Sequence, residues 1–272
     1  MKLLSLIVVC LTGGLLLYGT ADLPDWGDPN APAALHLSNY YIENTIRDTQ
    51  VPNLVTAVLA DYRSIDTMFE TAVVFCAGLA CFLLLRDFTP KKDQYYSHVP
   101  SGVILHVKNP DRQVIVGNEF EDIDKEWLPP DTIIKTVCRM LIPFIQIYAL
   151  YVVAHGDFSP GGGFQGGVIL GSSFILLAIS YNLKYLLKRV SEKFLGILAA
   201  AGVLIYLGIG LVAMVLGGNF LDYEKYAAIF GEHHIRALGM LGVEIGVGMS
   251  VTAVMVIIYI NIVSEGKHDE GL

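Results

Sequence analysis

Residues 238–263 read LGMLGVEIGVGMSVTAVMVIIYINIV, an apolar run with one charged residue, Glu244. A helix needs about 17 to 25 mainly apolar residues to cross a bilayer, so this run is long enough to span a membrane. Five more windows of that kind precede it, at residues 3–18, 68–85, 133–154, 164–183 and 194–220. The pattern predicts about six transmembrane helices.

Composition supports the same fold class. The 272 residues are 54% hydrophobic and 16% charged, and the mean hydropathy is +0.55. In a typical water-soluble domain, about a quarter of all residues are charged. We therefore expect an all-α integral membrane protein, and the net charge of -8 argues against nucleic acid as a partner.

Lysine and arginine predict the orientation, because they gather in cytoplasmic loops. Six lie between residues 86 and 131 and four between 184 and 193, whereas the opposite loops hold few. Both termini should then be cytoplasmic, with the chain in the cell inner membrane. The first window could instead be a cleaved signal peptide, since Lys2 precedes an apolar run that ends in small residues.

The chain divides unevenly. Residues 1–97 hold two predicted helices, residues 98–130 form a polar cytoplasmic linker, and residues 131–272 hold four helices with short loops, a 2 + 4 arrangement. Within the linker, β-branched runs at 102–108 and 113–117 flank Asn109-Pro-Asp111, which is typical of a short β-hairpin.

Glu244 is the main candidate for chemistry. An ionised group at that depth costs about 3 kcal/mol or more, so the carboxyl must be neutral, paired or facing water. A buried carboxyl of this kind can pass protons on. The alternative is a protonated Glu that only hydrogen-bonds a neighbouring helix.

A glycine-rich run joins the third and fourth windows, His155-Gly-Asp-Phe-Ser-Pro-Gly-Gly-Gly-Phe-Gln-Gly-Gly167. It lacks the Lys-Ser/Thr ending of a phosphate loop. Glycines four residues apart predict a smooth strip for close helix packing. The proposed packing motif comprises Pro160, Gly161, Gly162, Gly163, Gln165, Gly166, Gly167 and Gly171.

Other charged residues are weaker candidates for an ion or proton path. Asp66 and Glu70 share one helix face, as do Lys135 and Arg139, and either pair could line a polar opening or simply reach the interface. The remaining candidates are His155, Asp157 and Asp222. The four cysteines form no C-x-x-C pair, so we expect no disulfide, metal site or cofactor.

Several of these residues resemble a known family. Lys135-Thr-Val-Cys-Arg139, His155-Gly-Asp157, the glycine-rich run, Gly217-Gly-Asn-Phe-Leu-Asp222 and Gly242-Val-Glu-Ile-Gly246 are similar to the B-type subunit of the Mrp or Mnh multisubunit Na+/H+ antiporters. Residues 53–70 resemble the small module at the end of the A-type subunit of these antiporters, which membrane-bound hydrogenases carry as a separate small subunit. Phe69 departs from that module, which usually has Gly there.

The resemblance implies a non-catalytic transport subunit whose partners are large, complex-I-like antiporter subunits, and whose ions are Na+ and H+. Two alternatives stay open. The chain could belong to the ion-translocating arm of a group-4-type hydrogenase or related redox complex. It could also be a purely structural assembly subunit, in which case Glu244→Gln would be silent and Gly167→Leu would stop assembly.

Overall fold

The computed structural model describes residues 2–85, 93–98, 104–108, 120–122, 132–231 and 235–264. The chain forms two compact units, Met1–Asp48 and Thr49–Leu272. The smaller unit holds the apolar helix α1 (Lys2–Gly19), a 3-10 turn η1 (Thr20–Asp22), a π-helical turn η2 (Ala33–Leu37) and most of the polar helix α2 (Ser38–Thr49). The predicted division at residues 97 and 131 stays a prediction.

The larger unit is mainly helical. Its first part holds α3 (Leu54–Ala57), the π-helical turn η3 (Val58–Tyr62) and α4 (Ser64–Leu85). After the strands come α5 (Thr132–Ala154), α6 (Gly163–Tyr181), α7 (Leu183–Arg189), α8 (Glu192–Val215), η4 (Tyr223–Tyr226), α9 (Ala227–Phe230) and α10 (Ile235–Val263).

Among the residues that the structure describes, five helices are long and apolar enough to cross a membrane: α4, α5, α6, α8 and α10. They coincide with five of the six predicted windows. The remaining window corresponds to α1, a shorter apolar helix. The prediction of a helical, multi-pass membrane protein is confirmed.

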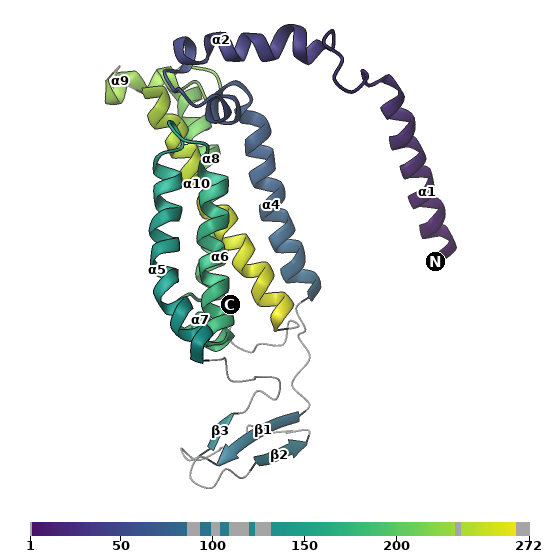
Figure 1. The fold of residues 1–272 in the computed structure, drawn as a ribbon, viewed down its shortest axis with the longest axis vertical. Helices are drawn as coiled ribbons and strands as arrows, with labels where there is room; N and C mark the ends of the chain where they lie inside the picture. The colour runs from purple at the N-terminus through teal and green to yellow at the C-terminus, as the bar shows by residue number, and fades with distance from the viewer. Residues whose placement is uncertain are drawn as a thin grey trace. The chain divides into compact units, whose positions relative to one another are not determined.

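Helix α10 is the centre of the bundle. It packs against α4, α6 and α8, and Figure 1 shows it in yellow passing among them. Two-thirds of its apolar window, 67%, is buried within the protein, against 11% for α4. Helix α10 is hydrophobic on all sides and mostly buried, so it forms the core of the bundle. The other four spans expose more of their surface.

Glycines set the close approach to α10. A Cβ on Gly167 of α6 would lie 2.8 Å from the carbonyl oxygen of Gly248, and one on Gly246 would lie 2.7 Å from the carbonyl oxygen of Gly202 in α8. Both distances are shorter than side chains tolerate. Small residues let helix backbones approach in lipid, where apolar side chains gain little by meeting.

Three short strands form an antiparallel sheet in the order β2-β1-β3: β1 (Asp93–His98), β2 (Ile104–Lys108) and β3 (Phe120–Asp122). Tyr95 pairs with His106, and Ser97 pairs with Glu121. The first run of the predicted hairpin contains β2. Its second run, residues 113–117, lies outside the described residues, so a pairing between the two runs stays a prediction.

Candidate functional site

The Glu244 carboxyl is buried inside the bundle. The residue is 9% exposed, and Val243, one position before it, and Val247, three positions after it, are buried apolar residues. Because Glu244 follows the first residue of α10 by nine positions, it lies about 14 Å along the helix. Its Oε2 atom is buried without a hydrogen-bond partner among the described residues. An ionised carboxylate in that state is costly, so the group requires a proton or a cation.

The loop between α5 and α6 encloses this carboxyl. A Cβ on Gly162 would lie 2.6 Å from Oε1 of Glu244, and one on Gly156 would collide with Oε2. A Cβ on Gly163 would collide with the backbone carbonyl of Glu244. Glycine at these three positions therefore leaves the space that the carboxyl occupies. The glycine-rich run thus contacts Glu244 directly, in addition to packing α6 against its neighbours.

Asn53 and Thr56, at the start of α3, hold that loop from the opposite side. The Asn53 side-chain amide donates to the carbonyls of Gly156 at 2.7 Å and Ser159 at 2.6 Å. The Thr56 hydroxyl also donates to the Gly156 carbonyl, at 2.8 Å. The backbone N–H of Asn53 donates to the carbonyl of Asp157 at 3.1 Å. These bonds join segments about 100 residues apart and fix the loop over Glu244.

A cavity of about 40 Å³ adjoins Glu244. That volume holds about two to three waters. Its polar lining comes from four elements: Thr56 of α3, Thr67 of α4, Gln165 of α6 and Tyr206 of α8. The Tyr206 hydroxyl donates to the backbone carbonyl of Ser64 at 2.8 Å. The Glu244 carboxyl therefore faces a small polar space within an apolar core.

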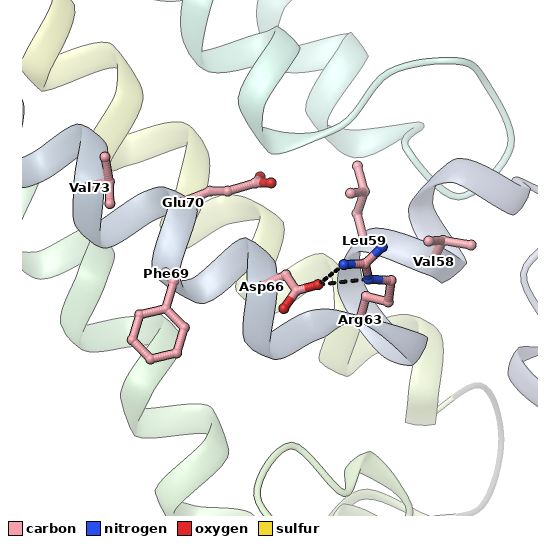
Figure 2. Close-up of a pocket in the computed structure, with 7 residues that line it drawn as sticks. All are labelled: Val58, Leu59, Arg63, Asp66, Phe69, Glu70 and Val73. Atoms are coloured by element: carbon pink, nitrogen blue, oxygen red, sulfur yellow. Dashed lines mark hydrogen bonds and ion pairs between the residues drawn. The ribbon is translucent and has the colours of Figure 1, made fainter. Parts of the chain in front are cut away.

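A larger pocket of about 570 Å³ lies next to it, along η3 and α4. Figure 2 shows Asp66 pointing at Arg63, whose Nε donates to Oδ2 of Asp66 at 2.7 Å, while the Glu70 carboxylate lies apart from them. Leu59 lines both this pocket and the cavity at Glu244. Tyr206 is close enough to both Glu70 and Glu244 to interact electrostatically with each.

The structure brings some predicted site residues together and separates others. Asp157 is half-buried near Glu244, its Oδ1 has no hydrogen-bond partner among the described residues, and burial raises the pKa of its carboxyl. His155 stacks on Tyr151 with ring centroids 4.0 Å apart and is exposed. Asp222 lies near Gly218 at the start of η4.

Lys135 and Arg139 do not reach the site. Both are exposed in the first two turns of α5, whereas the glycine-rich loop follows the last residue of that helix. Nineteen positions separate Lys135 from Ala154, which is about 28 Å along a helix. Lys135 instead places its ammonium 4.9 Å from the centre of the Tyr181 ring.

The remaining packing-motif residues lie on α6 or just before it. Gly166 lies against Val153 of α5, Gly171 lies against Met255 of α10, and Gly161 lies against Val152. Pro160 is exposed in the loop, and Gln165 is exposed on α6 while also lining the cavity. The strip of glycines therefore fits α6 between α5 and α10.

Sequence reasoning missed Asn53, Thr56 and Tyr206 as site residues. Asn before Leu-Val-Thr is an N-cap signature, and its side chain does accept from Val55 N–H at 3.0 Å. That signal predicts a helix start and gives no indication of the bonds to a distant loop. Tyr206 is a lone hydroxyl-bearing aromatic residue in an apolar window, which could have marked it as polar lining.

Two family models match separate parts of the chain. Residues 133–257 match the domain related to the MnhB subunit of Na+/H+ antiporters, and residues 29–99 match the MbhE subunit of MBH. The chain is 26% identical over 200 residues to a protein of Rhizobium meliloti named as a probable K(+)/H(+) antiporter A/B subunit. That match covers 71% of this chain and 19% of the relative, so the chain spans about a fifth of that protein's length.

Solved structures show the same fold. A chain of the Mrp complex from Dietzia sp. matches with a TM-score of 0.61 and 27% identity, over 99% of this chain and 26% of that one. A chain of the membrane-bound sulfane sulfur reductase (MBS), an archaeal respiratory membrane complex, matches with a TM-score of 0.57 and 23% identity, over 96% of this chain and 97% of that one.

Proteins of Staphylococcus aureus are among the relatives that correspond to a single antiporter subunit. The protein named mnhB2 is 30% identical over 135 residues, which cover 48% of this chain and 94% of that protein. This match agrees in length with the region of the MnhB model and confirms the predicted resemblance. The chain therefore belongs to the family of MnhB-related subunits of multisubunit Na+/H+ antiporters.

Proposed function

We propose that this chain is a membrane subunit of a multisubunit cation/proton antiporter, in which Glu244, Asp66 and Glu70 line a route for the ion or the proton. One observation carries the proposal above the others. Glu244 is buried, and its Oε2 atom has no hydrogen-bond partner in the described part of the chain, although the carboxyl adjoins a polar cavity. Intramembrane acids of this kind are usually functional.

The route runs from the open pocket to the buried cavity. Arg63 neutralises Asp66 in the wall of the open pocket, which leaves the Glu70 carboxylate to attract cations. Tyr206 interacts electrostatically with both Glu70 and Glu244. Leu59 lines both spaces and belongs to the π-helical turn η3. Such turns occur frequently at functional sites. A displacement of Leu59 would connect the pocket with the cavity.

The membrane arrangement follows from the charged loops. We propose six spans, with α1 as the first, and both termini in the cytoplasm of a cell whose inner membrane holds the complex. The glycine-rich loop would then lie on the outer side. Its partners would be large, complex-I-like antiporter subunits, because this chain has no lysine in the middle of a predicted span.

A redox-driven complex is the second candidate. The match of residues 29–99 to the MbhE subunit of MBH and the end-to-end likeness to a chain of the MBS complex both favour it. In that case the same Glu244 route would be coupled to electron transfer elsewhere in the complex.

Composition of the intact complex tests the proposal. The chain should be purified in mild detergent through a tag at Leu272, and all co-purifying proteins should be identified by mass spectrometry. Antiporter-type subunits alone support the antiporter, whereas added nickel–iron or iron–sulfur subunits support the redox complex. A chain that purifies alone and stable would contradict both.

Activity of the same preparation tests the route. In proteoliposomes, a Na+ or K+ gradient should drive proton movement in the wild type, and Glu70→Gln should reduce it. Glu43→Gln, at an exposed position of α2, serves as the matched control and should leave it unchanged. Unchanged transport in Glu70→Gln would remove Glu70 from the route.

A further inference from the structure

We propose that the 40 Å³ cavity at Glu244 is a binding site for one monovalent cation, which takes the place of the proton on Glu244. The inference rests on the proposed function and assigns the ligand to a particular set of oxygen atoms. They are the carboxylate of Glu244, the hydroxyls of Thr56, Thr67 and Tyr206, and the amide oxygen of Gln165.

The hydroxyl groups of the lining residues can serve as acceptors. Thr56 and Tyr206 already donate their protons to backbone carbonyls, those of Gly156 and Ser64, both at 2.8 Å. Their oxygens can therefore act toward a ligand only as acceptors, although the Thr56 oxygen already accepts one bond, from the Asn53 side-chain amide at 3.0 Å. Thr67 adds a buried hydroxyl oxygen with no hydrogen-bond partner among the residues that the structure describes. Hydroxyl groups whose protons are already donated elsewhere can offer a ligand only their oxygen atoms, which favours a cation over an anion.

Charge in the lining points the same way. The lining residues include one carboxylate, Glu244, and none of them is Lys, Arg or His. Asp157 lies within electrostatic range and adds to the negative potential. A single carboxylate balances a single positive charge, whereas Ca2+ sites commonly combine several carboxylates. The small volume also excludes an organic cation and leaves room for about one or two waters beside the ion.

Binding and protonation are then mutually exclusive. The protonated carboxyl releases its proton when the cation enters, so one cation exchanges for one H+ and the net charge of the buried site stays constant. The other titratable groups around Glu244 are Asp157 in the α5–α6 loop, Tyr206 in α8 and Glu70 in α4. One-for-one exchange at a buried carboxyl is the elementary event that an antiporter needs.

Infrared difference spectroscopy on the purified complex tests the site. The band of the protonated Glu244 carboxyl is assigned by its loss in Glu244→Gln. Addition of NaCl or KCl at constant pH should remove this band, and an equal concentration of choline chloride should not. In Thr67→Val the half-saturating cation concentration should rise about tenfold, because one ligand oxygen is lost. Thr67→Ser keeps that oxygen and should stay near the wild type.

Two results would overturn the site. A Glu244 carboxyl band unaffected by both Na+ and K+ would exclude a cation that replaces the proton, and an unchanged half-saturation in Thr67→Val would exclude the proposed ligand set. Either result would leave Glu244 as a proton carrier if Glu244→Gln still abolished antiport. Full antiport in Glu244→Gln would instead contradict the proposed function itself.

Discussion

Replacing Gly162 with Ala should displace the Glu244 carboxyl without removing it. The added Cβ would lie 2.6 Å from Oε1, and ordinary contact begins near 3.4 Å, so the carboxyl must move by about 0.8 Å. The backbone at Gly162 is extended, so Ala is not strained there. Such overpacking typically costs about 1 to 3 kcal/mol, and a misplacement of about 1 Å can slow a reaction about a hundredfold.

Antiport should therefore fall by about ten- to a hundredfold in Gly162→Ala. The assay is cation-driven proton movement in proteoliposomes, with equal amounts of intact complex confirmed by mass spectrometry. Gly208→Ala in α8 is the matched control, because a Cβ there meets no atom within 4 Å in the described structure. Equal antiport in Gly162→Ala, Gly208→Ala and the wild type would refute the idea that the glycine-rich loop positions Glu244.

Three further predictions concern stability. Asn53→Ala should lower the Tm of the complex, because the Ser159 carbonyl loses the Asn53 donor and the Gly156 carbonyl keeps only the bond from Thr56. Asn53→Asp keeps only the cap acceptor, so recovery of Tm in that variant would contradict this. Burial raises the pKa of the Asp157 carboxyl, so the folded protein favours the protonated form, and this stabilisation is lost as pH rises above 3.8. Asn stays neutral at every pH, so Asp157→Asn should raise Tm more at about pH 7 than at about pH 4. Gly202→Ala should lower Tm by roughly 2 to 10 °C, because its Cβ would collide with the backbone of Gly246 and Ser250. An unchanged Tm would contradict this prediction, because α8 and α10 could then move apart without loss of stability.

Most of the helical fold could be predicted from the sequence. A bilayer requires about 20 apolar residues per span, so composition alone locates α4, α5, α6, α8 and α10. Neighbouring helices could not be predicted, since apolar side chains in lipid do not favour one partner over another. The central place of α10 depends on contacts such as Gly167 with Gly248, which lie about 80 residues apart.

The candidate site could be predicted only in pieces. Glu244 was evident from its apolar surroundings, and the glycines were evident from their spacing. The contact between Glu244 and the glycine-rich loop could not be predicted. A glycine leaves space for a neighbouring group, and the sequence does not indicate which group fills that space. The clamp by Asn53 was missed because its N-cap role accounts for the residue without any distant partner.

Glu244→Gln, compared with Glu43→Gln, tests the central claim most directly. Gln keeps the size and hydrogen-bonding capacity of the buried side chain and removes its ability to bind or release a proton. Both variants should assemble with the same partner subunits by mass spectrometry. The account predicts that Glu244→Gln loses cation-driven proton movement in proteoliposomes while Glu43→Gln retains it. Full antiport by an assembled Glu244→Gln complex would contradict the account and leave this chain a structural role.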